Sequence, residues 1–289
     1  MIGVFDSGIG GLTVLRALAH RFPGEAFLYL GDHANVPYGN RESDEVLALT
    51  QASVARLFES GCALVLLGCN TATAVAARHM QQAWLPASAW AGRGHNVLGI
   101  VAPTVEVATQ TPWAVTTPQY PQKFNEETIV VFATARTVAS GVYPEEIAKR
   151  CPRIRVVQIV CHDLVDAIEA MGEDGGSEAE AACASIVRLA VDEAHAACSG
   201  RPPERAILGC THFPLVEQLF ADAMPRTRLL SQPRIVADSL DDYLGRHARF
   251  RSAPEADGGV KLLTTGDAAA ISAQARLFWP DAPAFSRAD

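Results

Sequence analysis

The sequence predicts an α/β protein with mainly parallel sheets, because short apolar runs alternate with longer amphipathic stretches along the chain. The apolar runs are continuous rather than alternating, which is typical of strands that are buried on both faces. They span residues 2–5, 26–30, 63–67, 97–101, 129–132, 156–160, 206–208 and 261–263. Open sheets of this kind bind ligands at the carboxyl ends of their strands, so the residues directly after each run are candidates for function.

The stretches between these runs have the periodicity of amphipathic helices. The clearest cover residues 12–21, 43–59, 164–171 and 179–197. Residues 84–127 interrupt the alternation of strands and helices, because they hold three of the four tryptophans together with Pro86, Pro112, Pro118 and Pro121. We expect much of this stretch to be a long loop around one strand.

The composition is that of a globular protein, with 49% hydrophobic and 19% charged residues in a chain of 289. The net charge of −8 and the lack of a basic run argue against nucleic acid as a partner. No apolar run reaches the roughly 18–20 residues that a membrane span needs, and the first residues lack a signal-peptide pattern. Seven scattered cysteines predict reduced thiols in a cytoplasmic protein. Their spacing predicts no metal site.

Two cysteines share the same local setting. Gly68-Cys69 and Gly209-Cys210 each follow an apolar strand, and each is followed by two polar residues. If the two strand ends face each other, both thiols lie across one cleft. A cysteine at a strand end is more often a packing residue, because cysteine is among the most buried residue types. The repeated setting favours function for the pair.

A glycine-rich turn follows the first strand and opens a helix. It runs from Asp6 to Gly11 and could bind an anion through its backbone N–H groups, or could be only a tight turn of small residues. It lacks the dinucleotide fingerprint and the lysine of a phosphate-binding loop. A carboxylate at this strand end could accept a proton or orient a thiol.

Six short blocks together resemble the glutamate racemases of the aspartate/glutamate racemase superfamily, and they occur in that family's order. They are FDSGIGG at 5–11, VPYGN at 36–40, CNTA at 69–72, ATARTVASGVY at 133–143, LGCTHFP at 208–214 and TTGD at 264–267. The resemblance implies two doubly wound α/β domains related by pseudo-twofold symmetry, with the active site in the cleft between them. The expected domains are residues 1–100 plus 238–289 and residues 101–237.

The resemblance also implies a mechanism without a cofactor. Racemisation removes the Cα proton from one face and returns a proton on the other, so two bases are needed. Cys69 is expected to take the proton from the D-isomer and Cys210 from the L-isomer. Because a free thiol has a pKa around 8.5, each needs help to ionise near neutrality. Asp6 matches the family residue that assists the first cysteine, and His212 the one that assists the second.

Further residues match the family's binding positions. Those expected to hold the substrate's amino and carboxylate groups are Ser7, Tyr38, Gly39, Asn70, Thr71 and Thr211. Thr134 and Thr137 resemble contacts to the side-chain carboxylate. Glu169 resembles an acid near the second cysteine, with a solvated helix position as the alternative. Some residues depart from the family's pattern, among them His33-Ala34-Asn35 and His162, and these leave oligomer contacts, regulation and substrate preference open.

The expected partner is therefore glutamate, and neither nucleic acid nor a membrane is expected as a partner. A homodimer is a possible assembly of the chain. The activity implied is glutamate racemisation, which supplies D-glutamate for peptidoglycan. A racemase for aspartate or another small α-acid would fit the same thiols. A hydrolase with a cysteine nucleophile would leave the second thiol without a role. The intact set of candidate residues argues against a binding protein without activity.

Overall fold

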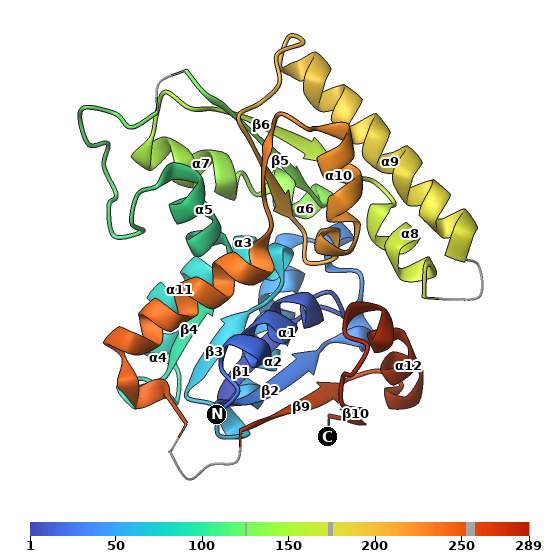
Figure 1. The fold of residues 1–289 in the computed structure, drawn as a ribbon. Helices are drawn as coiled ribbons and strands as arrows, with labels where there is room; N and C mark the ends of the chain where they lie inside the picture. The colour runs from blue at the N-terminus through green and yellow to red at the C-terminus, as the bar shows by residue number, and fades with distance from the viewer. Residues whose placement is uncertain (125, 173–175, 253–257, 289) are drawn as a thin grey trace. The chain divides into compact units, whose positions relative to one another are not determined.

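A computed structural model describes residues 1–124, 126–172, 176–252 and 258–288. The chain divides into two compact units, here called unit 1 (Met1–Ile100 with Val236–Asp289) and unit 2 (Val101–Ile235). Each unit contains its own sheet, and all pairings between strands are parallel within the part of the chain that the structure describes (Figure 1). This confirms the predicted α/β class. The pseudo-twofold relation and the shared cleft stay predictions.

Unit 1 holds a six-stranded sheet in the order β10-β9-β2-β1-β3-β4. Its strands are β1 (Ile2–Asp6), β2 (Ala26–Gly31), β3 (Leu64–Leu67), β4 (Asn96–Gly99), β9 (Gly259–Thr264) and β10 (Phe285–Arg287). Its helices are α1 (Leu12–Arg21), α2 (Ser43–Glu59), α3 (Asn70–His79), α4 (Leu85–Ala87) and α12 (Ala268–Phe278), and α11 (Gln232–Arg246) begins in unit 2 and ends here. The central strands β1 and β3 are buried along their whole length, as their continuous apolar sequences predict.

Unit 2 holds a four-stranded sheet in the order β6-β5-β7-β8. Its strands are β5 (Thr128–Ala133), β6 (Arg155–Val160), β7 (Arg205–Gly209) and β8 (Arg228–Leu230). The helices are α5 (Val101–Thr109), α6 (Ala135–Ala139), α7 (Val142–Arg150), α8 (Leu164–Ala170), α9 (Gly176–Ala197) and α10 (Glu217–Ala223).

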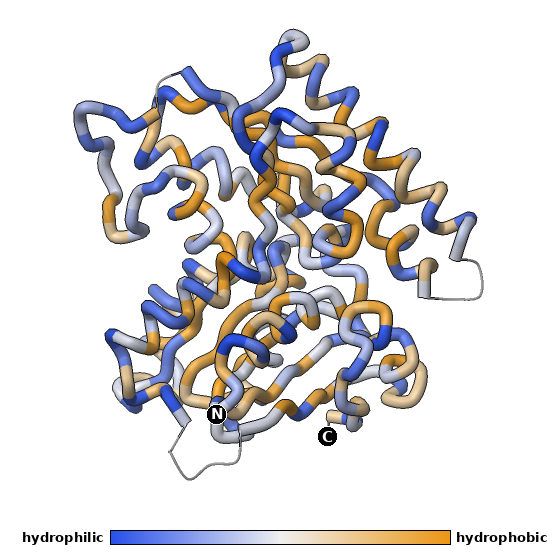
Figure 2. Tube along the Cα trace, viewed as in Figure 1, coloured by the Kyte–Doolittle hydropathy of each residue, from blue (hydrophilic) through white to orange (hydrophobic). Residues whose placement is uncertain are grey.

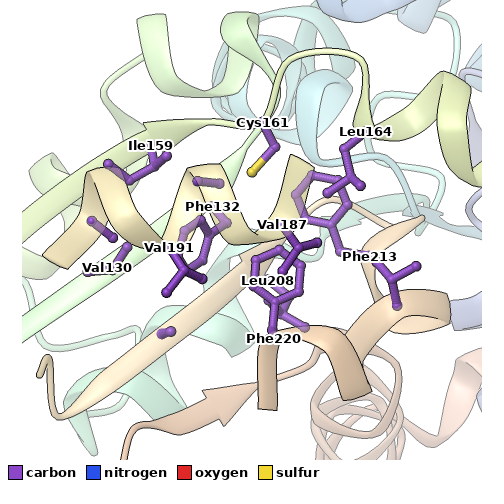
Figure 3. Close-up of a cluster of buried hydrophobic side chains, with 14 of the residues drawn as sticks. Val130, Phe132, Ile159, Cys161, Leu164, Val187, Val191, Leu208, Phe213 and Phe220 are labelled. Atoms are coloured by element: carbon purple, nitrogen blue, oxygen red, sulfur yellow. The ribbon is translucent and has the colours of Figure 1, made fainter. Parts of the chain in front are cut away.

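The core of unit 2 covers both faces of its sheet. Because successive strand residues point to opposite faces, Phe132 and Leu208 pack with α9 and α10, whereas Val131 and Ile207 pack with α7. Figure 3 shows the first of these clusters, where Phe132, Leu208 and Phe220 lie together. Along α9 the hydropathy alternates between apolar and polar (Figure 2), which is the pattern of a helix with one buried face.

Parts of the predicted element map are wrong. The strand expected at 97–101 ends at Gly99, and Val101 instead begins helix α5 inside the stretch expected to be mostly loop. Beyond α5, residues 110–124 contain neither helix nor strand, as expected, and Asn125 lies outside the described residues. The short strands β8 and β10 were not predicted. They have three residues each, which is too few to show a periodicity.

Candidate active site

Cys69 lies where β3 ends and α3 begins in unit 1. The backbone N–H of Gly68 donates to the carbonyl of Phe5 at 2.6 Å, which ties the end of β3 to β1. Cys69 is the N-cap of α3, and its sulfur accepts a hydrogen bond from the N–H of Ala72 at 3.4 Å. The thiol therefore lies in the partly positive field of a helix N-terminus, which favours a negative charge on sulfur.

Asp6 and Ser7 bring polar groups from the end of β1 to the same place. The Ser7 hydroxyl lies 3.4 Å from the Cys69 sulfur, and the buried Asp6 carboxylate accepts from the Gly8 N–H at 2.7 Å. Position 11 must be glycine here, because a Cβ on Gly11 would lie 2.6 Å from the Cβ of Asp6. The glycine-rich turn thus makes room for the carboxylate.

The electrostatics of this group favour a neutral thiol. Burial and the nearby Asp6 carboxylate raise the pKa of Cys69 to about 12, against the opposing hydrogen bonds from Ser7 and Ala72. A negatively charged Asp6 therefore does not stabilise a thiolate at Cys69. Any assistance that it gives must come from accepting a proton or from holding a cation between the two groups.

Tyr38 is buried beside this group and is held by an acid that sequence reasoning missed. Its hydroxyl donates to Asp32 at 2.6 Å, and Asp32 also accepts from the Thr265 hydroxyl and the Asn35 amide. Burial and this hydrogen bond raise the pKa of Tyr38, so its hydroxyl stays neutral. Asp32 did carry a signal, because like Asp6 it is an acid at the carboxyl end of a buried strand. Gly39 follows Tyr38 in a short 3-10 helix.

Asn70 and Thr71 form the first turn of α3 directly after Cys69. Both are buried, with 3% and 4% of their surfaces exposed. The structure thus brings Asp6, Ser7 and the first turn of α3 together at the carboxyl ends of β1 and β3, which are neighbours in the sheet.

Cys210 follows β7 in unit 2 and forms a second group of polar residues. Its sulfur lies 3.8 Å from Nδ1 of His212, whose Nε2 lies 2.7 Å from the Glu169 carboxylate at the end of α8. Position 209 has little room, since a Cβ on Gly209 would lie 3.0 Å from the carbonyl oxygen of Phe132. The Glu169 side chain is 35% exposed, so it links a buried imidazole to solvent.

The two partners of His212 raise the pKa of its imidazole. Burial lowers its pKa, but hydrogen bonds and charge interactions with Cys210 and Glu169 outweigh burial and raise the pKa to about 10. A cation beside sulfur stabilises a thiolate. The two thiols therefore have opposite surroundings, because Cys69 has a carboxylate nearby and Cys210 has an imidazolium.

Three threonines lie at the carboxyl ends of β5 and β7. The Thr134 hydroxyl donates to the hydroxyl of the buried Thr137 at 3.1 Å across the first turn of α6. Thr211, between Cys210 and His212, has 4% of its surface exposed. Since β5 and β7 pair directly, these hydroxyls and Cys210 occupy the same edge of the unit 2 sheet.

The described residues contain neither a metal-binding cluster nor a membrane-spanning helix. No group of three or more His, Cys, Asp or Glu side chains there could hold a metal ion. Among the helices in the described ranges, none is long and apolar enough to cross a membrane.

Comparisons with known proteins place the chain in a family. No family model matches it. It is 45% identical over 285 residues to the glutamate racemase of Phenylobacterium zucineum, and the alignment covers 96% of each chain. Among solved structures it is similar to a glutamate racemase isoform from Bacillus anthracis, with a TM-score of 0.83 over 100% of this chain and 97% of that one. That pair shares 23% identity, so the likeness shows the fold.

A second solved structure is the glutamate racemase of Thermus thermophilus in complex with beta-chloro-D-alanine. It is 27% identical, with a TM-score of 0.76 over 100% of this chain and 96% of that one. The sequence match to the curated relative and both structural matches extend over nearly the whole chain. Because the identity to the curated relative is 45% over 96% of the chain, the chain belongs to the glutamate racemase family of amino-acid racemases.

Proposed function

We propose that this protein interconverts L- and D-glutamate by a two-base transfer of the Cα proton, with Cys69 and Cys210 as the bases and no cofactor. One observation carries the proposal. Each thiol lies at the carboxyl end of a buried parallel strand, and each is hydrogen-bonded to its own polar group. That the two strand ends face one substrate from opposite sides is part of the proposal.

In the direction from L to D, a thiolate at Cys210 removes the Cα proton and the thiol of Cys69 delivers a proton to the opposite face. The reverse direction exchanges the roles. The raised pKa of Cys69 and the imidazolium at His212 support a resting state in which Cys69 holds its proton. That state is ready for L-glutamate.

The D-isomer needs a different starting state, because Cys69 must first lose its proton. The ammonium group of a bound substrate, placed between Asp6 and Cys69, would supply the positive charge that this group lacks. Enantiomers have equal free energies in water, so kcat/KM must be the same in both directions at every pH. We therefore expect the asymmetry of the two thiols to appear as a difference in kcat between the two directions, matched by the same fold-difference in KM.

The proposed binding roles follow the chemistry of the side chains. Ser7, Asn70, Thr71 and Thr211 supply hydroxyl and amide groups for the amino and α-carboxylate groups, together with Tyr38 and Gly39. Thr134 and Thr137 are proposed to bind the side-chain carboxylate, to which both hydroxyls can donate once the Thr134 hydroxyl turns from Thr137 toward the substrate. Glu169 holds His212 in its cationic form. We further propose that the product serves peptidoglycan synthesis in the cytoplasm.

The direct test incubates the purified protein with L- or D-glutamate in deuterium oxide and follows chirality and Cα exchange, with aspartate in parallel. We expect racemisation of glutamate. The absence of exchange from either glutamate isomer would contradict the proposal, and faster turnover of aspartate would change the substrate assignment. A covalent acyl adduct on one cysteine would instead indicate a hydrolase.

The two thiols are tested by substitution. Cys69→Ser and Cys210→Ser should each abolish net racemisation. A serine hydroxyl does not ionise near neutral pH, so it cannot replace the thiolate as the base. Cys198→Ser serves as the matched control, since Cys198 is a buried cysteine after α9 outside both groups. If either site variant racemises as fast as the control, the two-thiol scheme is wrong. Light scattering on the same samples tests the homodimer.

A further inference from the structure

A small cavity lies in unit 2 beside the irregular segment that follows α5. None of its lining residues belongs to the group formed by Cys210, His212 and Glu169. It has a volume of about 80 Å³ and is lined by residues of 110–123 and by Arg150 and Cys151 at the end of α7. Figure 1 shows this segment as the long connection between α5 and β5. One water needs about 10–15 Å³ of such space, so the cavity has room for several oxygen atoms.

Cationic side chains lie around this cavity, and two of them are in ion pairs, Arg150 with Glu146 and Arg205 with Glu127. Arg150 and Lys123 belong to its lining, which contains no carboxylate. Burial raises the pKa of Cys151, whereas the charges of Arg205, Lys123 and Arg150 lower it, which places all three cations near this thiol. Lys123 donates to the carbonyl of Gln110 at 2.6 Å and has no acidic partner among the described residues.

Arg150 has a buried nitrogen without a hydrogen-bond partner. Its side chain is 1% exposed, Nη1 pairs with Glu146, and Nη2 donates to the carbonyl of Trp113, whose ring lies 4.2 Å from the guanidinium. The Nε–H is buried and has no hydrogen-bond partner. A buried donor without an acceptor is unfavourable, so an acceptor supplied from the cavity would stabilise this arrangement.

Gln122 has one acceptor left over. It is 9% exposed, and its Nε2 donates to the carbonyl of Gln119 at 2.6 Å. This contact fixes the orientation of the amide, because the reverse orientation would place two oxygens against each other. Oε1 is then buried without a donor. The lining therefore offers a cationic donor, a lysine ammonium and an acceptor.

We propose that this cavity binds inorganic phosphate. The anionic oxygens accept from the Arg150 Nε–H and from Lys123, and the hydroxyl that inorganic phosphate keeps at neutral pH donates to Oε1 of Gln122. Sulfate and carboxylates have no hydroxyl for Gln122, and a phosphate monoester is mostly a dianion without one at pH 7, because its second pKa is about 6. Inorganic phosphate, sulfate and phosphate monoesters all present tetrahedral oxyanions to the cavity. The hydroxyl of inorganic phosphate distinguishes it from the other two, because only that group donates to Gln122.

Titration calorimetry in a phosphate-free zwitterionic buffer tests this site, with inorganic phosphate, sulfate and a nucleoside monophosphate as separate titrants. We expect saturable binding of one phosphate per chain and weaker binding of the other two. Trp113 emission should change over the same concentration range. The absence of saturable phosphate binding overturns the proposal, and tighter binding of the monophosphate overturns the role of the hydroxyl. The test does not depend on the racemase activity.

Three variants locate the site. Lys123→Gln should weaken phosphate binding by about tenfold, since hydrogen bonds to charged groups are the strong ones. Gln122→Met should remove the preference for phosphate over sulfate. Arg153→Gln is the matched control, because it deletes one positive charge at an exposed position two residues beyond Cys151, outside the lining. If Arg153→Gln weakens phosphate binding as much as Lys123→Gln does, phosphate responds only to the overall charge of the protein. That result would contradict the proposed site.

Discussion

The two candidate catalytic cysteines differ in the charge of the group beside them, and this difference decides what each neighbour can do. His212 is a cation that favours a thiolate at Cys210. Asp6 is an anion that opposes one at Cys69. The sequence alone supports the choice of these residues, through the repeated Gly-Cys setting and the matching blocks. It could not predict the sign of each interaction, which depends on distances and burial.

A substitution at Asp6 separates two possible roles for this carboxylate. Asp6→Asn removes the charge that raises the pKa of Cys69, so alkylation of Cys69 by iodoacetamide at pH 8 should become several-fold faster while racemisation falls. Peptide mapping by mass spectrometry measures the alkylation, with Asp44→Asn on the exposed start of α2 as the control. Slower alkylation of Cys69 would mean that Asp6 stabilises the thiolate after all.

His212 should make stability depend on pH in the alkaline range. Its pKa is raised from 6.5 to about 10 in the folded protein, so the folded state binds the proton more tightly than the unfolded state. The contribution of the imidazolium to the free energy of unfolding is complete below about pH 6.5 and is lost as the pH rises through about 10. Urea unfolding between pH 6 and 10 measures it.

The control for that measurement is a second histidine. The difference in unfolding free energy between the wild type and His212→Asn should shrink as the pH rises, and His20→Asn at an exposed position serves as the control substitution. A difference for His212→Asn that is independent of pH would contradict the cationic assignment. Glu169→Gln should weaken the same dependence, because it removes the carboxylate 2.7 Å from Nε2.

At the scale of elements, the sequence predicts best where the pattern is long. Helices α1 and α2 have the predicted bounds, because each has a clear amphipathic period. Helix α5 was missed, since its residues Val101–Thr109 are mostly apolar or β-branched and include a proline, so they show no polar face. The edge strands β8 and β10 form through pairing with β7 and β9, which no local pattern reveals.

Helix α3 provides a test at this scale, because Cys69 is both its N-cap and a candidate base. Serine is a good N-cap and alanine is a poor one, with a difference of about 1 kcal/mol. Cys69→Ala should therefore lower the free energy of unfolding by roughly that amount relative to Cys69→Ser, while both variants lack racemase activity. Chemical denaturation measures the difference. Equal stabilities would show that a side-chain acceptor at position 69 does not stabilise α3.

At the scale of the whole molecule, each unit contains one of the two candidate thiols together with its own polar group. The sequence predicted the two thiols through their similar positions after apolar strands, and the sheets show how polar residues gather around each of them. Parallel pairing brings the ends of neighbouring strands to one edge, so Asp6 meets Cys69 in unit 1 and Thr134 lies on the same edge as Cys210 in unit 2. The contact of Tyr38 with Asp32 belongs to no motif and emerges only from the fold.

Substrate binding should be visible without turnover. A variant with both Cys69→Ser and Cys210→Ser keeps the proposed binding residues, so L- or D-glutamate at a hundred times its Kd should stabilise it by about 2.7 kcal/mol. Thermal unfolding with and without ligand measures this, with aspartate as the comparison. Equal stabilisation by aspartate would argue against glutamate as the specific ligand.

The two-base mechanism is tested most directly by the fate of the Cα hydrogen in deuterium oxide during the first few per cent of conversion. When one base removes the proton and another delivers one from solvent, the product isomer carries deuterium while the recovered substrate keeps its hydrogen. We predict this outcome from both L- and D-glutamate. Deuterium in the recovered substrate at the same rate as in the product, or product that retains the original hydrogen, would contradict the assignment of Cys69 and Cys210 as two separate bases.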